Sequence, residues 1–360
     1  MIRFWGGGII LICISLFTGG CRQISTELPS VSLPVDIKTN AIDLEVDTMI
    51  TSEAFIHAKM YYVYKDSTLI VINQATETVP YLEVRNLTDN WKIGNYIPLG
   101  KGPGEMLRVV AYLEGNTLKV NDFVKKQIAF VNLDSLLKNP NGYQISSCNY
   151  QVLTNAINRF SDGKLLFENP YCFSDSKSGI ENKNAPRLKI GDNTTNDEDF
   201  GTYDYVTHNV SQGRLVYNQN RNRIVYASSS IPVVEIYDST LAPLMRIVGP
   251  DSFDDQMYVI APDGLVTYKK TAPYAYLTYS YDDDYFYLVY NGELIDFNVK
   301  QEKDLHTWIF RFDWDGNFEG SYYYPGYVNA ISISGDGKSF YASARDEDNM
   351  PMLVKLSGIE

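Results

Sequence analysis

The stretch Leu99 to Glu105 (LGKGPGE) is rich in glycine and carries one lysine, so it raises the question of a phosphate site. A P-loop needs GxxxxGK followed by Ser or Thr at the start of a helix, because backbone N–H groups and the helix N-terminus hold the anion. Here Lys101 follows the first glycine, no Ser or Thr follows it, and Pro103 lacks a backbone donor. The stretch predicts a tight connection between strands, with Lys101 and Glu105 as candidates for a binding face.

Three acidic runs are the candidates for a metal site: DNTTNDED at 192–199, DSFDD at 251–255 and YDDDY at 281–285. A calcium loop needs oxygen ligands at alternating positions and a glycine bend. These runs have neither feature, so they indicate solvated loops. No metal or other cofactor is predicted from them.

The sequence offers no arrangement typical of nucleophilic catalysis. His57, His208 and His306 lack a metal-ligand partner at i+2 or i+4, and no GxSxG motif occurs. Cys148 and Cys172 lack the CxxC spacing of redox or zinc sites. In an oxidising compartment they could form a disulfide, and the alternative is two unpaired thiols.

The N-terminal residues predict export. Residues 1–20 combine Arg3 with a short apolar core, Ile9 to Phe17, which is too short to span a bilayer. The following sequence TGGC resembles a bacterial lipobox in which Cys21 is lipidated, although Thr18 replaces the usual aliphatic residue. An ordinary secretory signal is the alternative. Residues 21–40 are polar and are interpreted as a tether, and 41–360 as the folded domain.

The formal net charge of −13 restricts the partners. Nucleic acids and anionic lipids require basic patches, so neither is expected as a ligand. The predicted partners are an envelope protein, a peptide or a glycan, with membrane contact only through the lipid anchor.

The elements that must position any site are β-strands. Short runs rich in Val, Ile, Tyr and Phe recur between Gly, Asn and Asp clusters, and no segment after the signal keeps a helical period. Two units repeat: an apolar strand ending in aspartate and a turn (QIAFVNLDS, VVEIYDSTL, WIFRFDWDG), and an Asp-Gly hairpin (FSDGKLLF, APDGLVTY, SGDGKSFYA). A period of about 50 residues over an all-β chain predicts a propeller of six four-stranded blades. We expect Ile42 to Asp47 to close the last blade.

The LGKGPGE stretch and the later IYDSTL and IFRFDWDGNF segments resemble the TolB-like six-bladed β-propeller lipoproteins of Bacteroidales. The resemblance covers roughly residues 40–357 and implies a fold and an envelope location, because molecular function in that family is largely unassigned. It also implies O-glycans at Asp-Ser/Thr sites, here Thr48, Ser67, Ser135 and Ser239.

These observations predict a lipid-anchored outer-membrane protein that acts as a binding or assembly module through one propeller face. Its periplasmic or cell-surface orientation is left open. The 28 tyrosines provide rings for blade packing and for a ligand surface. One alternative is a calcium-dependent hydrolase or lactonase with its site in the central channel. Another is a structural subunit of an outer-membrane complex.

Overall fold

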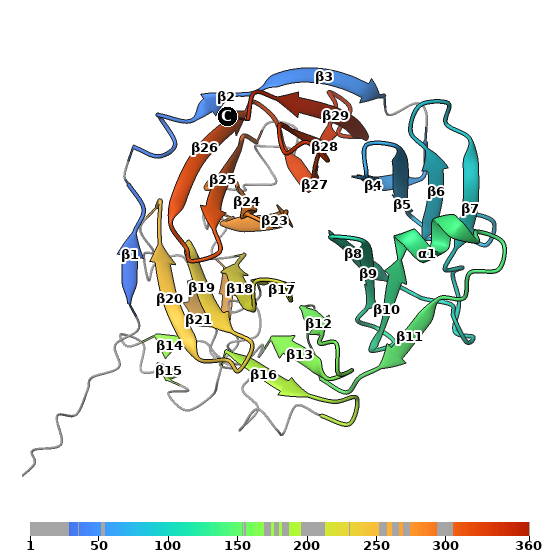
Figure 1. Cartoon of the computed structure of the whole chain (residues 1–360), viewed down its shortest axis with the longest axis horizontal. Helices are drawn as coiled ribbons and strands as arrows, with labels where there is room; N and C mark the ends of the chain where they lie inside the picture. Colours follow the sequence, from blue (N-terminus) through green and yellow to red (C-terminus); the bar gives the residue numbers. More distant parts are fainter. Residues whose placement is uncertain are drawn as a thin grey trace, which may run out of the picture.

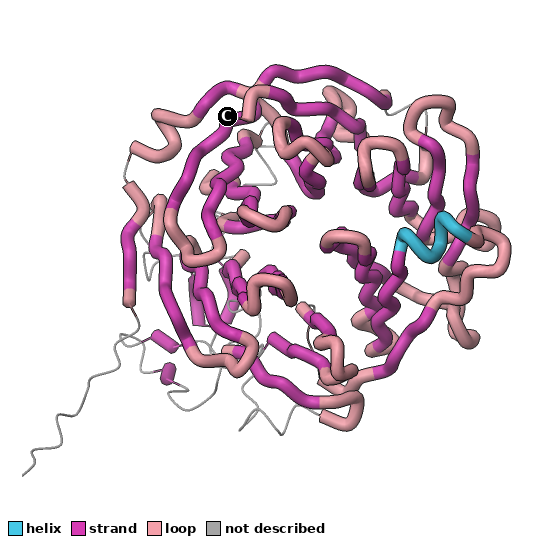
Figure 2. Tube along the Cα trace, in the orientation of Figure 1, coloured by secondary structure: helices cyan, strands magenta, loops and turns pink. Residues whose placement is uncertain are grey.

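The computed structural model describes residues 29–34, 36–51, 55–152, 154, 156–168, 174–175, 180–181, 187–195, 213–229, 231–251, 258–260, 266–268, 274–293 and 305–359. Over these residues the chain is an all-β, six-bladed propeller, which confirms the predicted fold (Figure 1). Helix α1 (Leu133–Lys138), cyan in Figure 2, lies after a strand of the second blade.

Blades 1 to 3 each begin with the strand nearest the axis. Their strands are β4 (Ala58–Tyr64), β5 (Thr68–Asn73), β6 (Leu82–Asn86) and β7 (Lys92–Tyr96); β8 (Val109–Glu114), β9 (Thr117–Asp122), β10 (Gln127–Asn132) and β11 (Ser146–Asn149); and β12 (Ile157–Arg159), β13 (Leu165–Glu168) and β16 (Leu188–Gly191). Within the described residues blade 3 has three strands. The two-stranded sheet of β14 (Ser174–Asp175) and β15 (Ile180–Glu181) comes between its last two strands in sequence.

Blades 4 to 6 complete the ring with the same antiparallel order. Their strands are β17 (Gly213–Asn218), β18 (Arg223–Ser228), β19 (Val233–Asp238) and β20 (Pro243–Val248); β23 (Tyr276–Tyr281), β24 (Tyr285–Tyr290), β25 (Thr307–Asp313) and β26 (Phe318–Tyr324); and β27 (Val328–Ile333), β28 (Ser339–Arg345) and β29 (Pro351–Ser357). The short hairpin of β21 (Tyr258–Ile260) and β22 (Val266–Tyr268) forms its own sheet.

The ring closes through β3 (Glu45–Ile50), which pairs antiparallel with β29 and supplies the outer strand of blade 6. A closing N-terminal strand was predicted, but the strand lies three residues further along than the expected Ile42 to Asp47. The reason is that β2 (Ile42–Asp43) instead pairs parallel with β26 of blade 5. Closure thus joins both ends of the domain in one sheet, which removes an exposed edge.

The described part of the expected tether, residues 29–40, lies against the propeller. Strand β1 (Ser30–Ser32) pairs parallel with β20 and gives blade 4 a fifth strand, as β2 does for blade 5. Leu33 and Ile37 are buried in the core between these blades. Lys38 forms an ion pair with Asp251 at 2.8 Å. This segment therefore packs along the outer edge of blades 4 and 5.

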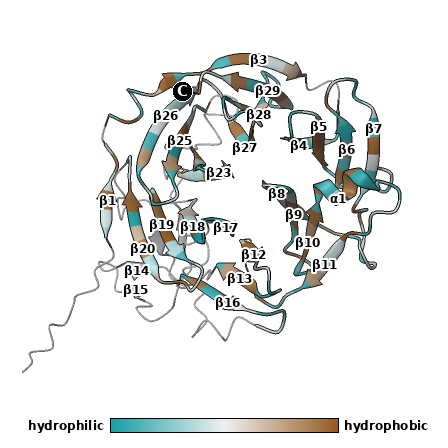
Figure 3. Cartoon of the chain, in the orientation of Figure 1, coloured by the Kyte–Doolittle hydropathy of each residue, from teal (hydrophilic) through white to brown (hydrophobic). Residues whose placement is uncertain are grey.

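Each interface between neighbouring blades contains its own hydrophobic cluster. Six clusters of buried residues are found in the described chain, one between each pair of adjacent blades around the ring. Figure 3 shows the hydrophobic residues concentrated on strands and the hydrophilic ones on the connections. Tyrosine is a main component: Tyr62, Tyr226, Tyr276 and Tyr287 are almost fully buried. The rings of these tyrosines therefore contribute to blade packing.

The first strand of every blade runs in the same sense, so the turns that follow these strands gather on one face. We call it the turn face; its turns are residues 65–67, 115–116, 160–164, 219–222, 282–284 and 334–338. The predicted Asp-Gly hairpins are confirmed where described, because Gly163 and Gly337 have φ of 89° and 71°. The third predicted Asp-Gly turn, Asp263-Gly264, lies outside the described residues.

Candidate functional site

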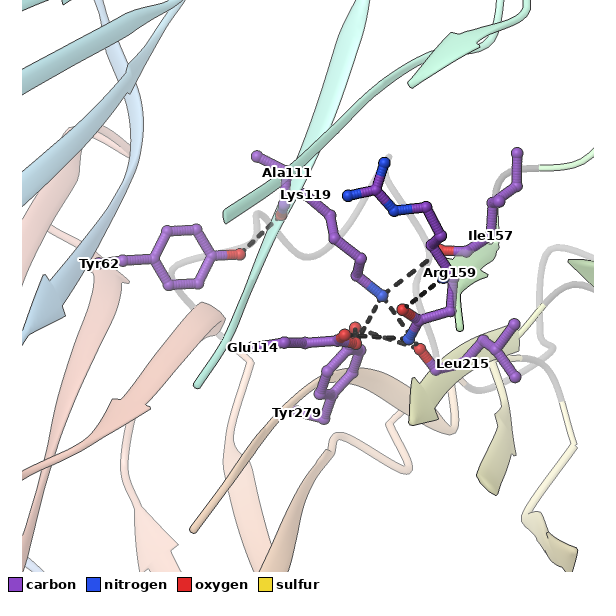
Figure 4. Close-up of polar contacts among 9 residues, drawn as sticks. Tyr62, Ala111, Glu114, Lys119, Ile157, Arg159, Leu215 and Tyr279 are labelled. Carbon is purple, nitrogen blue, oxygen red and sulfur yellow. Dashed lines mark hydrogen bonds and ion pairs between the residues drawn. The ribbon is translucent and has the colours of Figure 1, made fainter. Parts of the chain in front are cut away.

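A polar cluster lies at the axis where blades 2 to 5 meet. Glu114 is the last residue of β8, and Lys119 is on β9 of the same hairpin. Asn158 comes from β12 of blade 3 and Tyr279 from β23 of blade 5. Figure 4 shows the Lys119 and Tyr279 side chains converging on the Glu114 carboxylate.

The centre of the cluster is a buried ion pair. Lys119 Nζ lies 2.5 Å from Glu114 Oε1, and the two side chains are only 5% and 6% exposed. The same ammonium lies 3.3 Å from the carbonyl oxygen of Leu215 in blade 4 and 3.5 Å from that of Ile157 in blade 3. One lysine thus connects the inner strands of three blades.

Glu114 extends this network to blade 5. Its Oε2 accepts a hydrogen bond of 2.9 Å from Asn158 Nδ2, and its Oε1 accepts one from the Tyr279 hydroxyl. The ammonium also lies 5.7 Å from the centre of the Tyr279 ring. A charge in a buried site needs this degree of pairing, because desolvation of an isolated ion costs several kcal/mol.

Burial shifts the titration of the cluster. It lowers the pKa of Lys119, and the neighbouring Glu114 acts in the opposite direction. Burial, followed by the Glu114 charge, raises the pKa of Tyr279 well above its ordinary value, so its hydroxyl remains a donor. Because these groups satisfy one another, they form a polar floor with partners from four blades.

An open pocket of about 480 Å³ lies on this floor at the turn face. We call it the turn-face mouth. Side-chain amides, aromatic rings and both signs of charge line it: Glu114, Asn116, Thr117, Lys119, Phe130, Asn132, Asn158, Arg159, Tyr217, Asn218, Gln219, Asn220, Tyr281 and Asp283. A second hollow of about 390 Å³ shares Gly115, Asn116 and Tyr281 with it. The combined surface has the size of small-molecule and oligomer sites, with an unusually polar lining.

The predicted candidates Lys101 and Glu105 lie away from this mouth, on the connection from β7 to β8 at the opposite face. Glu105 Oε2 accepts a hydrogen bond of 2.6 Å from the Gly102 backbone N–H. A Cβ atom on Gly100 would lie 2.0 Å from the same oxygen, so a side chain at this position would displace the Glu105 carboxylate. Lys125 Nζ donates to the carbonyls of Gly102 and Glu105. LGKGPGE is therefore a self-bonded connection between two blades, and Lys101 is exposed on it.

The cysteine candidates do not contribute to the turn-face mouth where they are described. Cys148 is half-buried, and burial raises its pKa. Its predicted partner Cys172 lies outside the described residues, as do Cys21 and His208. The disulfide and the lipid site therefore stay predictions.

Several of the acidic and histidine candidates have local partners, whereas His57 is exposed on the turn before β4. Asp282 of the YDDDY run accepts hydrogen bonds from the backbone N–H groups of Asp284 and Tyr285, as a turn-forming aspartate does. His306 Nδ1 lies 2.7 Å from Glu293 Oε1. The DSFDD run beyond Asp251 and residues 196–199 of the DNTTNDED run lie outside the described residues. Among the described residues, no three His, Cys, Asp or Glu side chains are grouped to hold a metal ion.

The predicted glycosylation residues lie at the surface in different degrees. Thr48, Ser67 and Ser135 are exposed, and Ser239 is half-buried. Exposure is compatible with modification and does not test it.

The buried polar cluster was not predicted from the sequence, although the sequence contains one indication of it. In YLEGNTLKVND (112–122) a lysine interrupts an apolar strand three residues after the turn. Strand alternation places such a lysine on a solvated face, whereas every residue of β9 after Thr117 is buried. Asn158 and Tyr279 come from distant hairpins, so no spacing connects them to Lys119.

Six blades and a closing N-terminal strand around a polar channel mouth define a six-bladed β-propeller. The family model for TolB-like six-bladed propellers matches residues 41–336, and the chain belongs to this family. No curated protein matches the chain in sequence.

Two solved structures share the fold at low identity. A Bacteroides fragilis protein named as a candidate exported protein has 13% identity and a TM-score of 0.50, with 92% of this chain and 99% of that chain covered. A member of the DUF4221 family from Bacteroides vulgatus has 11% identity and a TM-score of 0.52, covering 88% and 98%. The described part of this chain contains no helix long and apolar enough to cross a bilayer.

Proposed function

We propose that this protein is a binding module of the bacterial envelope that holds its ligand in the turn-face mouth. The observation that carries this proposal is the open polar pocket of about 480 Å³ above the buried floor. Four blades build the floor, so the pocket is formed before a ligand arrives and little ordering entropy is lost on binding.

A calcium-dependent hydrolase has less support. Calcium takes six to eight oxygen ligands. The Glu114 carboxylate at the axis is already engaged by Lys119, Asn158 and Tyr279. The described residues around this floor therefore do not fit a calcium ion, and we derive no catalytic step from them.

The proposed location follows from the predicted export signal and from the exported character named for a structural relative. We propose that a lipid on Cys21 holds the protein at the outer membrane. Replacing Cys21 with Ser should abolish labelling by radioactive palmitate in the native host and release the protein from the membrane fraction. Unchanged labelling would refute this part of the proposal.

Binding at the mouth is tested by blocking it. Asn220 is exposed on the turn of blade 4 and lines the mouth, whereas Gln74 is exposed and lines a separate hollow. The panel to screen comprises envelope polysaccharides, peptidoglycan fragments and solubilised envelope proteins. Asn220→Trp should abolish binding of whichever panel member the wild type binds, and Gln74→Trp should leave it intact. The reverse pattern would place the site elsewhere and overturn the proposal.

A further inference from the structure

Arg159 places a positive charge in the wall of the turn-face mouth. It is the last residue of β12 and is exposed. Its guanidinium carbon lies 4.4 Å from the centre of the Phe130 ring in blade 2. No carboxylate in the described part of the chain lies within ion-pairing distance of it, although the protein carries a net charge of −13. An arginine held on a ring keeps its planar fork of donors available for a carboxylate.

Two amides of the mouth are fixed so that they also offer donors. The Asn132 side-chain oxygen accepts a hydrogen bond of 2.8 Å from the Ser135 backbone N–H, as the cap of α1. The Asn218 side-chain oxygen accepts one of 3.1 Å from the Arg221 backbone N–H. With the oxygens engaged, the two Nδ2 groups have no partner among the described residues and can donate to a ligand.

The mouth therefore presents donors from three blades over a floor that is internally satisfied. Its few rings lie among amides, and Arg159 covers Phe130, so an apolar anchor has little to contact. Hydroxyl groups of a sugar match amide donors and acceptors, and a carboxylate matches the guanidinium. We propose that the turn-face mouth binds an acidic saccharide, with its carboxylate on Arg159 and its hydroxyls on Asn132 and Asn218. This inference rests on the proposed binding function and specifies the class of ligand.

Two charged residues of the mouth allow substitutions that should change the affinity for an acidic saccharide in opposite directions. Asp283 lines the mouth from the exposed turn of blade 5 and should oppose an anionic ligand. Arg159→Gln should weaken binding by about tenfold or more, as expected for loss of a charge-assisted hydrogen bond. Arg159→Lys should restore only part of the affinity because it lacks the planar fork. Asp283→Asn should strengthen binding.

The probe is trigalacturonate, and its affinity is measured by titration calorimetry with the chain without its signal. Methyl-esterified trigalacturonate and a tri-glutamate peptide are measured in the same way for comparison. We expect the free acid to bind, the ester to bind at least tenfold more weakly, and the peptide not to bind. Equal binding of acid and ester would overturn the role of Arg159, and binding of the peptide alone would assign the site to acidic peptides. If neither acid nor ester binds while Asn220→Trp still blocks another panel member, the saccharide inference fails and the proposed function stands. Unchanged thermal unfolding of Arg159→Gln ensures that a loss of affinity reports ligand contact.

Discussion

Separating Lys119 from Glu114 should destabilise the propeller far more than breaking an ion pair at its surface. The side chains are 5% and 6% exposed and the pair joins the inner strands of several blades. In Lys119→Met, the remaining carboxylate keeps donors from Asn158 and Tyr279, so we expect a loss of about 3 kcal/mol, the lower end for a broken buried pair. In Glu114→Gln, the ammonium loses the negative charge beside it and keeps neutral partners, among them the carbonyl oxygens at 3.3 and 3.5 Å. We expect about 4 to 5 kcal/mol there.

The double variant tests whether these losses share one cause. Lys119→Met with Glu114→Gln removes both charges, so its loss should be smaller than the sum of the single losses by about 2 to 3 kcal/mol. Urea unfolding followed by tryptophan fluorescence provides the free energies. The control is the exposed pair of Arg221 and Asp284, whose atoms are 2.6 Å apart with side chains 45% and 73% exposed. Asp284→Asn should cost less than about 1 kcal/mol. Additivity of the two floor substitutions within about 0.5 kcal/mol would refute the assignment of a coupled pair.

Three further predictions follow from the blade interfaces and connections. Burial raises the pKa of Glu168 to about 7 from its ordinary 4.5. The contribution of this group to stability is therefore complete below pH 4.5 and is lost as the pH rises through 7. Between pH 5 and pH 8 the free energy of unfolding of the wild type should fall by about 2 kcal/mol more than that of Glu168→Gln, and parallel pH profiles of the two proteins would contradict this. Glu105→Ala should lower the melting temperature, because it removes the hydrogen bond that holds the connection between blades 1 and 2. Lys101→Ala should leave the melting temperature unchanged. Equal effects of the two substitutions would show that the Glu105 carboxylate does not stabilise this connection. Replacing Glu45–Ile50 with a Gly-Ser linker of equal length should expose the edge of β29. The thermal unfolding transition in calorimetry should then broaden. An unaltered transition would mean that closure of the ring does not depend on β3.

Much of the fold could be predicted because its signals are local. Apolar runs with a period of two, ended by Asp-Gly turns, identify hairpins without reference to any distant residue. Gly163 and Gly337 take the positive φ that such turns require. Strand count and length then imply the number of blades.

Register and edge pairing could not be predicted in the same way. Residues Ile42 to Asp47 all look like strand, yet Ile42 and Asp43 pair with Tyr322 and Tyr323, and Glu45 begins the closing strand. The sequence of an edge strand specifies extended backbone but not which neighbour supplies its partner. For the same reason the polar segment around Ser30 to Ser32 was interpreted as a tether, although it pairs with β20.

The candidate site was outside the reach of local reasoning. Lys119, Asn158, Asn218 and Tyr279 belong to four blades and approach one another only after the ring has closed. Composition restricted only the class of partner, because the net charge of −13 argues against nucleic acid and anionic lipid as ligands. Arg159 has no carboxylate partner among the described residues, and its position depends on the closed ring and not on its sequence neighbours.

Stability and binding are coupled at the floor of the mouth but separable at its rim. Lys119 and Glu114 contact several blades, so a substitution there moves the walls of the pocket even if the ligand never contacts either residue. Arg159, Asn220 and Asp283 are exposed near the ends of their strands, and changes to their side chains alter the ligand surface with little effect on blade packing. Loss of binding in a Lys119 or Glu114 variant is therefore ambiguous. The same loss in Arg159→Gln, with unchanged unfolding, identifies a ligand contact.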